Sequence, residues 1–111
     1  MSEPVIVRHE GAITILSIND APYNRMSLDF MDRLEELVAE IAEATSTRAV
    51  VLTAEGEENF SVGMNLKQFA EGVERKGGAD ALLDQRLNVI RAIETMGKPW
   101  IATLFGYCLG G

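Results

Sequence analysis

The sequence predicts an α/β fold in which helices pack on a sheet that contains parallel strand pairs. Two observations predict it. Short apolar and β-branched runs recur along the chain, and between them lie two longer segments whose apolar residues repeat at helical spacing. Strands that alternate with helices favour parallel pairing, because each helix carries the chain back to the same end of the sheet. The expected order is strand, strand, helix, strand, a short strand with a short helix, helix and strand.

The first half of the chain predicts two strands and a long helix. Residues 5–9 and 12–18 form the strands, and the second of these, AITILSI, is apolar on both faces, which indicates burial on two sides. The polar stretch NDAPYN predicts a loop. A helix is then expected from an N-cap at Ser27 to about Ala44. Its predicted inward residues are Phe30, Leu34, Leu37, Val38 and Ile41.

The second half predicts shorter elements before a second long helix. Residues 49–54 predict a β-branched strand, FSVG a short extended piece, and residues 65–70 a short helix. The charged stretch GVERKGGAD is expected to be a mobile connection. These three elements therefore lead into a loop before the next helix begins.

The second long helix is expected from a cap at Asp80 to about Met96. Gly97 and Pro99 end it, because neither residue continues a helix well. A strand at 100–104 should follow, in the interior of the sheet, before the final GYCLGG. The predicted inward residues of the helix are Leu83, Leu87, Ile90 and Ile93.

Composition narrows the class of function. The 111 residues suit one domain, and the net charge of −7 argues against nucleic acid and anionic membrane surfaces as partners. The one cysteine, Cys108, and the one histidine, His9, cannot form a disulfide framework or a Cys/His metal site. We expect Cys108 to be a small buried hydrophobe and His9 a solvated strand residue. With no signal peptide and no apolar run of about 20 residues, the sequence predicts a cytoplasmic protein without a membrane span.

Two glycine-bearing turns follow apolar strands, in NFSVGMNLKQF and in WIATLFGYCLGG. Gly63 lets the backbone bend, so that the amide of Met64 points outward at the start of a short helix. Gly110 and Gly111 leave two amides with no side chain to guard them. Two such amides directed at one point form an oxyanion hole, although each glycine taken alone also fits ordinary turn chemistry.

Other readings of these turns fail on their residues. GYCLGG lacks the spacing of a phosphate-binding loop. Ser61 lacks the context of a serine nucleophile, and the chain has no second histidine that would serve as its base. Backbone amides are therefore the groups in these turns that best explain the pattern.

At these residues the whole chain resembles the crotonase superfamily, the enoyl-CoA hydratase/isomerase family. The most specific part of the resemblance is the pairing of FSVGMNLKQF with KPWIATLFGYCLGG. It implies a β-β-α spiral fold and a thioester oxygen held between the amides of Met64 and Gly111, which stabilise an enolate. The substrate it implies is an acyl-CoA thioester, with no cofactor beyond that coenzyme A and no metal. It also implies a homo-oligomer, a trimer or a hexamer.

The resemblance also implies which residues contact the substrate. In the family, coenzyme A is bound by the loop after the second strand and by the start of the short helix. Arg25 and Lys67 are suitable partners for its phosphates, although by themselves they also fit ordinary surface charge. The implied substrate-binding residues are Asn24, Arg25, Met26, Gly63, Leu66, Lys67 and Gly110.

The sequence departs from the family pattern in three ways. Asn65 stands where the family often has aspartate, which changes hydrogen bonding near the acyl group. Met64 is bulky, so its side chain either shapes the acyl pocket or packs in the core. Family members are roughly twice as long as this chain, as expected for domains of about 200–250 residues.

The length difference bears on function. In hydratases of the family, the glutamates that act as acid and base come after the glycine run. Residues 1–111 are therefore expected to be the N-terminal part of a single crotonase-like domain, truncated after that run. The predicted function is an enoyl-CoA hydratase/isomerase-type enzyme. The alternative is a catalytically incomplete fragment that serves as a CoA-binding or interaction module, and the isolated chain is expected to lack hydratase activity.

Overall fold

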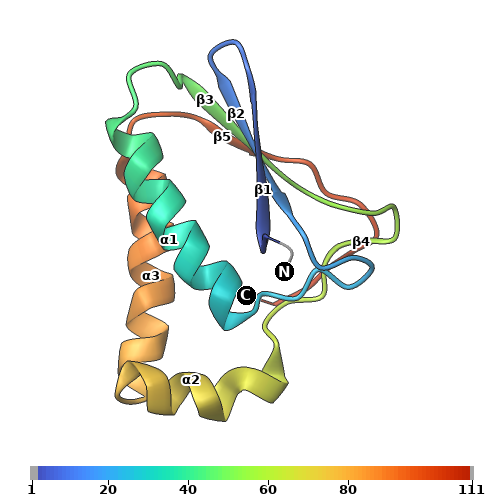
Figure 1. Cartoon of the computed structure of the whole chain (residues 1–111), viewed down its shortest axis with the longest axis vertical. Coiled ribbons are helices and arrows are strands. Elements are labelled where there is room, and N and C mark those ends of the chain that lie inside the picture. The colour runs from blue at the N-terminus through green and yellow to red at the C-terminus, as the bar shows by residue number, and fades with distance from the viewer. Residues whose placement is uncertain (1–2, 111) are drawn as a thin grey trace.

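A computed structural model describes residues 3–110 and contains a four-stranded sheet with the order β1-β2-β3-β5. β1 pairs antiparallel with β2, whereas β2–β3 and β3–β5 are parallel pairs (Figure 1). The predicted α/β class with parallel pairs is thus confirmed. The strands are β1 (Val5–Glu10), β2 (Ile13–Ile18), β3 (Ala49–Ala54) and β5 (Trp100–Ala102).

Helix α1 (Leu28–Glu43) covers the sheet and supplies much of the core. Its N-cap is Ser27, whose hydroxyl accepts a hydrogen bond from the Phe30 amide at 3.0 Å. All five residues predicted for its inward face are buried, because burial of that apolar stripe against strands such as β2 stabilises the helix. Leu16 and Val50 on the strands are 0% exposed and complete this core.

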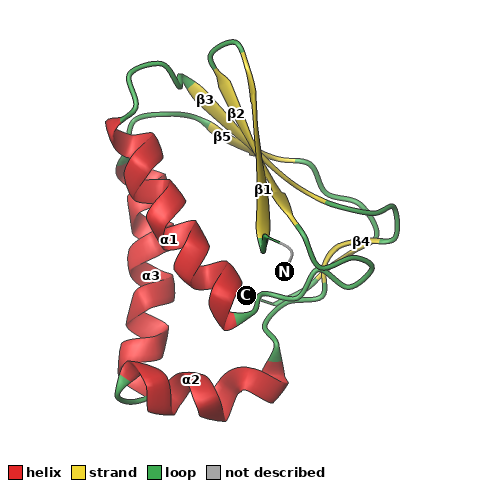
Figure 2. Ribbon diagram, viewed as in Figure 1, coloured by secondary structure: helices red, strands yellow, loops and turns green. Residues whose placement is uncertain are grey.

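A second, smaller sheet and a group of helices complete the described fold. β4 (Asn59–Ser61) pairs in parallel with β6 (Tyr107–Cys108), apart from the larger sheet. The 3-10 helix η1 (Leu66–Gln68), α2 (Phe69–Lys76) and α3 (Ala79–Thr95) lie between β4 and β5 along the chain. Figure 2 shows α3 beside α1, with α2 crossing below them. No helix within residues 3–110 has the length and apolar character needed to cross a membrane.

The predicted mobile connection at GVERKGGAD is wrong over much of its length, because α2 continues to Lys76. Gly72 is buried within α2, where an added Cβ would lie 2.7 Å from Leu28 Cδ2. Glu71 and Arg75 form a 2.8 Å ion pair one helical turn apart. Gly72 therefore allows close packing against Leu28, and the Glu71–Arg75 ion pair stabilises α2 itself, although the local composition suggested a loop.

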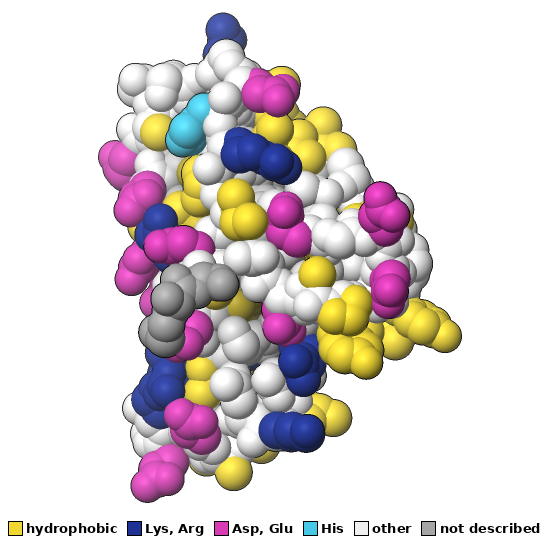
Figure 3. Space-filling view, turned by 45° about the vertical axis from the view of Figure 1, so that its right-hand side comes forward, with side chains coloured by type: hydrophobic (Ala, Val, Ile, Leu, Met, Phe, Trp, Pro, Cys, Tyr) yellow, Lys and Arg dark blue, Asp and Glu magenta, His cyan; other side chains and the backbone are white. Residues whose placement is uncertain are grey.

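The predicted inward face of α3 is wrong for three of its four residues, whereas the fourth, Ile93, is partly buried and packs against the core. Leu83, Leu87 and Ile90 are 44%, 56% and 50% exposed, whereas Leu82 and Val89 are buried. Periodicity identifies an apolar stripe on a helix, but it does not determine which neighbour covers that stripe. In this structure the opposite side of α3 packs on α1 and α2. A separate group of hydrophobic side chains gathers at the right-hand edge of the face drawn in Figure 3.

The last strands differ from expectation. β5 pairs only with β3 among the described strands, so it lies at the edge of the four-stranded sheet, and it ends at Ala102. Cys108 was expected to be buried, but its thiol is exposed on β6. The two-stranded sheet leaves β6 open on its outer side, so the apolar sequence there does not lead to burial. His9 is exposed, as predicted, with Nδ1 3.1 Å from Thr14 Oγ1.

Asp32 on α1 joins the three helices through a polar cluster. Lys76 Nζ and Gln85 Nε2 donate to its carboxylate at 2.7 and 2.8 Å, and Arg75 Nη1 lies 3.9 Å away. Burial by itself raises the pKa of Asp32, but hydrogen bonds from Lys76 and Gln85 and the charges of Lys76 and Arg75 outweigh burial. The net pKa lies below the ordinary value of 3.8.

This depressed pKa predicts an acid-sensitive contribution to stability. A carboxyl group with a lower pKa in the folded state stabilises the fold above its unfolded pKa and loses that contribution as pH falls through the folded value. Urea unfolding should therefore show a steeper loss of stability below about pH 4 for the wild type than for Asp32→Asn. Asp84→Asn, at an exposed site on α3, should follow the wild type. Equal slopes for the wild type and Asp32→Asn would contradict this prediction.

Candidate functional site

The two glycine-bearing turns lie side by side, although they are far apart in the sequence. β4–β6 pairing brings them together, and Leu109 N donates to Ser61 O at 3.0 Å just beyond the paired residues. Gly63 has φ +97, and a Cβ added there would lie 2.5 Å from Leu109 O and 3.3 Å from Gly110 Cα. Only glycine combines this backbone conformation with so close an approach of two backbones.

The Met64 amide is directed away from the loop that precedes α1. Met26 N donates to Gly63 O at 2.8 Å, and Asn65 N donates to Met26 O at 3.2 Å. These bonds pair Met26 with Met64 in a parallel bridge and use the groups on either side of Met64. The N–H of Met64 therefore points to the opposite side, and it has no hydrogen-bond partner within residues 3–110. Such a donor can accept a ligand oxygen as its partner.

Gly110 is described and lies against Gly63, with φ +62, whereas Gly111 lies outside the described residues. The predicted partner amide of the oxyanion hole, that of Gly111, therefore stays a prediction. The described geometry brings the residue before each of the two predicted amides into contact. This contact is compatible with a shared site for one oxygen.

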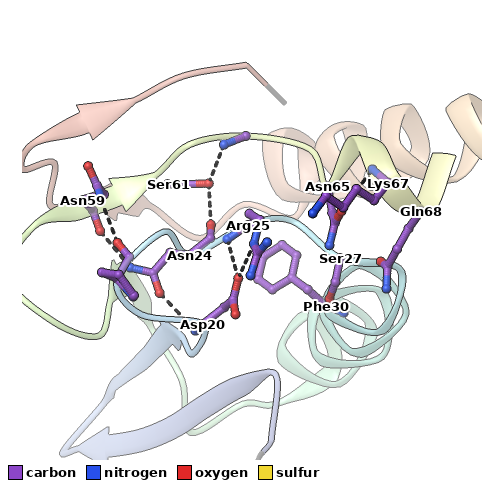
Figure 4. Close-up of polar contacts among 12 residues, drawn as sticks. Asp20, Asn24, Arg25, Ser27, Phe30, Asn59, Ser61, Asn65, Lys67 and Gln68 are labelled. Carbon is purple, nitrogen blue, oxygen red and sulfur yellow. Dashed lines mark hydrogen bonds and ion pairs between the residues drawn. The ribbon is translucent and has the colours of Figure 1, made fainter.

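Asn24 is a buried positioning residue. Its side chain is 0% exposed, and its Nδ2 donates to Glu55 O at 2.9 Å and to Asn59 O at 2.7 Å. Its Oδ1 accepts from Asp20 N, and its backbone oxygen accepts from Ser61 Oγ at 2.7 Å (Figure 4). With these groups occupied by the protein, the side chain has no free atom for coenzyme A. Its contact with the substrate stays a prediction, and in the described structure its side chain positions the loop.

Ser61 links that loop to the glycine turn. Its hydroxyl donates to Asn24 O and accepts from Gly63 N at 3.1 Å. Asn59 adds a second link, since its Nδ2 donates to Pro22 O at 2.8 Å. Asn59 and Ser61 were not predicted from the sequence as positioning residues. The signal that would have found them is the presence of buried polar residues in a strand next to an asparagine-containing loop, because buried polar groups must find partners.

The two basic residues predicted to meet phosphates differ in their surroundings. Arg25 Nε forms a 3.1 Å ion pair with Asp20, and its guanidinium lies 5.5 Å from the Tyr23 ring centroid. Lys67 is exposed on η1 and forms no ion pair with a described residue. Lys67 thus keeps its full charge for an anion, while that of Arg25 is partly balanced by Asp20.

Asn65 caps η1, because its Oδ1 accepts from the Lys67 amide at 3.2 Å. Leu66 beside it is 77% exposed, which suits contact with an apolar or amphipathic ligand. Gln68 Oε1 accepts from Leu28 N at 2.9 Å and so fixes η1 to the start of α1. The short helix is held at both ends while its outer side stays open.

Cavities occur near these residues and elsewhere. One of about 270 Å³ is bordered by Asp20, Arg25 and Asn65, on the side of the loop that faces η1. Another, of about 370 Å³, lies at the C-terminal end of α1 and is bordered by none of the predicted site residues. The first is therefore the cavity associated with the candidate site.

Comparison with known proteins identifies the family of the chain. A family model described as enoyl-CoA hydratase/isomerase matches residues 13–111. A short-chain-enoyl-CoA hydratase from Clostridium acetobutylicum is 30% identical over 108 residues, which are 96% of this chain and 41% of that protein. The alpha subunit of the fatty acid oxidation complex of Shewanella oneidensis is 29% identical over 109 residues, which are 96% of this chain and 15% of the subunit. The chain thus spans about two fifths or less of the length of these relatives.

Solved structures show the same fold. An enoyl-CoA hydratase/isomerase from Marinobacter aquaeolei superposes with a TM-score of 0.79 at 27% identity, over 95% of this chain and 42% of that one. Pseudomonas aeruginosa DspI superposes with a TM-score of 0.83 at 25% identity, over 96% and 40%. The crotonase-like α/β fold expected from the sequence is therefore confirmed over the part of these structures that the chain covers.

Proposed function

Because the chain belongs to the enoyl-CoA hydratase/isomerase family, we propose that it carries the thioester-binding part of an enzyme that acts on an enoyl-CoA. The observation that carries this proposal is the contact between the Gly63 and Gly110 turns, next to the Met64 N–H, which has no hydrogen-bond partner within residues 3–110. In the proposed arrangement, the amides of Met64 and Gly111 donate to the thioester oxygen. Donors fixed in this way favour the enolate over the neutral thioester, because the negative charge develops on that oxygen.

Hydration of the double bond follows from this polarisation. A base takes one proton from water as the water oxygen bonds to the β-carbon, and the electron pair of the double bond moves toward the thioester oxygen. An acid then gives a proton to the α-carbon as the enolate returns to a thioester. The chain's own part is to hold and polarise the thioester, whereas the choice between hydratase and isomerase depends on acid and base groups that we do not assign to residues 1–111.

The substrate's coenzyme A is proposed to lie along the outer side of η1 and the loop at 24–26. Lys67 supplies an unpaired positive charge there, Arg25 a partly balanced one, and Leu66 an exposed apolar contact. Met26 and Met64 lie on paired backbone segments, so their flexible side chains suit the acyl group. Asn24 acts indirectly, by fixing this loop against β4.

The experiment that tests this function uses the polypeptide as its natural gene encodes it, called here the natural polypeptide. Added to crotonyl-CoA, it should cause a loss of the conjugated enoyl thioester absorbance well above the rate in buffer. Lys67→Ala should raise KM several-fold at low salt and leave kcat unchanged, since a surface charge contributes up to about 1 kcal/mol. Arg48→Ala, at an exposed site bordering the cavity at the end of α1, is the matched control. The proposal would be refuted if the natural polypeptide neither turned over crotonyl-CoA nor bound an acyl-CoA.

A second candidate function is supported by the uncovered stripe on α3. Exposed Leu83, Leu87 and Ile90 provide an apolar surface suited to another copy or another part of a larger protein. The chain would then be a catalytically incomplete CoA-binding or interaction module, the N-terminal part of a single crotonase-like domain. Binding of an acyl-CoA without turnover would favour this candidate. Trimeric or hexameric assembly is proposed on the same surface.

A further inference from the structure

Arg86 is a buried charge without a partner among residues 3–110. It lies on the same side of α3 as the buried residues Leu82 and Val89, the side that packs against the rest of the protein. Arg86 itself is 8% exposed. Its Nε and Nη1 atoms are buried and form no hydrogen bond within residues 3–110. Buried guanidinium groups are normally paired, because removing an unpaired charge from water is costly.

No carboxylate balances this charge in the described part of the chain. The ion pairs there do not include Arg86. Its neighbour Gln85 points instead to Asp32 and Glu35. Burial lowers the pKa of Arg86, with no nearby acid to oppose the shift. Arginine still remains protonated, because its ordinary pKa lies so far above neutrality.

Arg86 lies behind the Met64 turn. It borders a small cavity together with Met26, Met64 and Asn65, the residues whose backbones form the bridge next to the glycine turns. The cavity measures about 10 Å³, which is room for one water molecule at most. An acyl group or a carboxylate does not fit there, so the charge acts across the turn and not by direct contact with a ligand.

We infer that the unpaired guanidinium of Arg86 supplies a standing positive potential at the Met64 amide and thereby stabilises the thioester enolate. The inference rests on the proposed function, which places that anion at this amide. In a site of low effective dielectric, a fixed charge attracts an anion over a longer range than it does in water. Arg86 thus acts at a distance, through its charge. Burying this charge lowers the stability of the fold, but it gives the site a fixed positive potential before the substrate binds.

A purely structural role for Arg86 makes a different prediction. Its side chain lines the same small cavity as Leu82 and Phe69, and packing of its aliphatic stem there would not need the charge. Arg86→Met keeps a long flexible side chain and removes the charge, whereas Arg86→Lys keeps a charge. Arg91→Met removes a charge from an exposed position on the same helix and is the matched control.

The test measures the ionisation of a bound probe. Acetoacetyl-CoA is a β-keto thioester whose enolate absorbs in the ultraviolet, and its apparent pKa can be titrated on the natural polypeptide. Wild-type protein should lower this pKa relative to free probe. Arg86→Met should weaken binding of the ionised probe roughly tenfold, which raises the probe's apparent pKa by about one unit. Arg86→Lys should restore part of the shift, and Arg91→Met should match the wild type.

Stability measurements separate this effect from misfolding. Urea unfolding should find Arg86→Met at least as stable as the wild type, because it removes an unpaired buried charge. Two results would overturn the inference: the same probe pKa on Arg86→Met as on the wild type, or a large loss of stability in that variant, which would reveal a carboxylate partner. Failure of the wild type to ionise the probe would refute the proposed function itself.

Discussion

Replacing Gly63 by alanine is expected to lower enoyl-CoA turnover by the natural polypeptide at least about a hundredfold, the cost of losing one oxyanion-hole donor. The added Cβ would lie 2.5 Å from Leu109 O, and the backbone at φ +97 is strained for any residue with a side chain. The turn must shift away from Gly110, and the Met64 amide moves with it. Stability should fall by about 3 kcal/mol, which combines overpacking with backbone strain.

Gly11→Ala is the matched control for that change. Gly11 also has a positive φ, +60, but a Cβ there meets nothing within 4 Å. Its cost should be about 1 kcal/mol of backbone strain, with turnover unchanged. Turnover assays and urea unfolding on both variants distinguish loss of the site from general strain. A Gly63→Ala protein with wild-type turnover would show that the contact between the turns has no role in the reaction.

Replacing Asn24 by aspartate is expected to give the largest loss of stability. The change keeps the shape of the side chain but turns a donor into a carboxylate oxygen that faces the carbonyl oxygens of Glu55 and Asn59. Two hydrogen bonds are lost and a charge is buried, so we expect destabilisation of about 4 kcal/mol or more. Small domains have about 5–15 kcal/mol in total, so much of the protein should unfold in mild urea.

Two further variants make the Asn24 prediction specific. Asn24→Gly keeps the positive φ of +52 while it removes the side-chain bonds, and it should cost about 2–3 kcal/mol. Asn88→Asp introduces the same charge at an exposed position on α3 and should be close to neutral. Urea unfolding measures all three. A tolerated Asn24→Asp substitution would mean that the amide does not hold the loop to β4.

The residues predicted for the site fall into two groups, those that the sequence alone indicates and those whose surroundings only the fold reveals. Gly63 and the Met64 amide were found because a glycine after an apolar strand is a local signal, and the structure places Gly63 against Gly110. Asn24 was assigned to the ligand because the family resemblance places coenzyme A at the loop after the second strand. Its burial depends on Glu55 and Asn59, whose carbonyl groups approach only after folding.

The helices show the same division. The apolar stripe of α1 is local, and its burial was predicted correctly, because α1 has one strongly apolar side that meets the sheet. α3 has a weaker contrast between its sides. Residues Leu82, Arg86 and Val89 recur at helical spacing as a second stripe, and this stripe is the one that packs. The arginine within this stripe is the feature of the sequence that would have indicated a buried charge.

Spacing and glycine placement predicted most of the elements, their order and the family resemblance, because each depends on residues close together along the chain. They did not predict the length of α2, the start of α3 at Ala79 or the strand β6. Tertiary structure alone decided that Gly63 touches Gly110, that Asn24 is enclosed, and that α3 leaves Leu83, Leu87 and Ile90 uncovered. Those outcomes depend on the packing of segments far apart in sequence. The free energy of such packing is a property of paired surfaces, and no single stretch of sequence contains both surfaces.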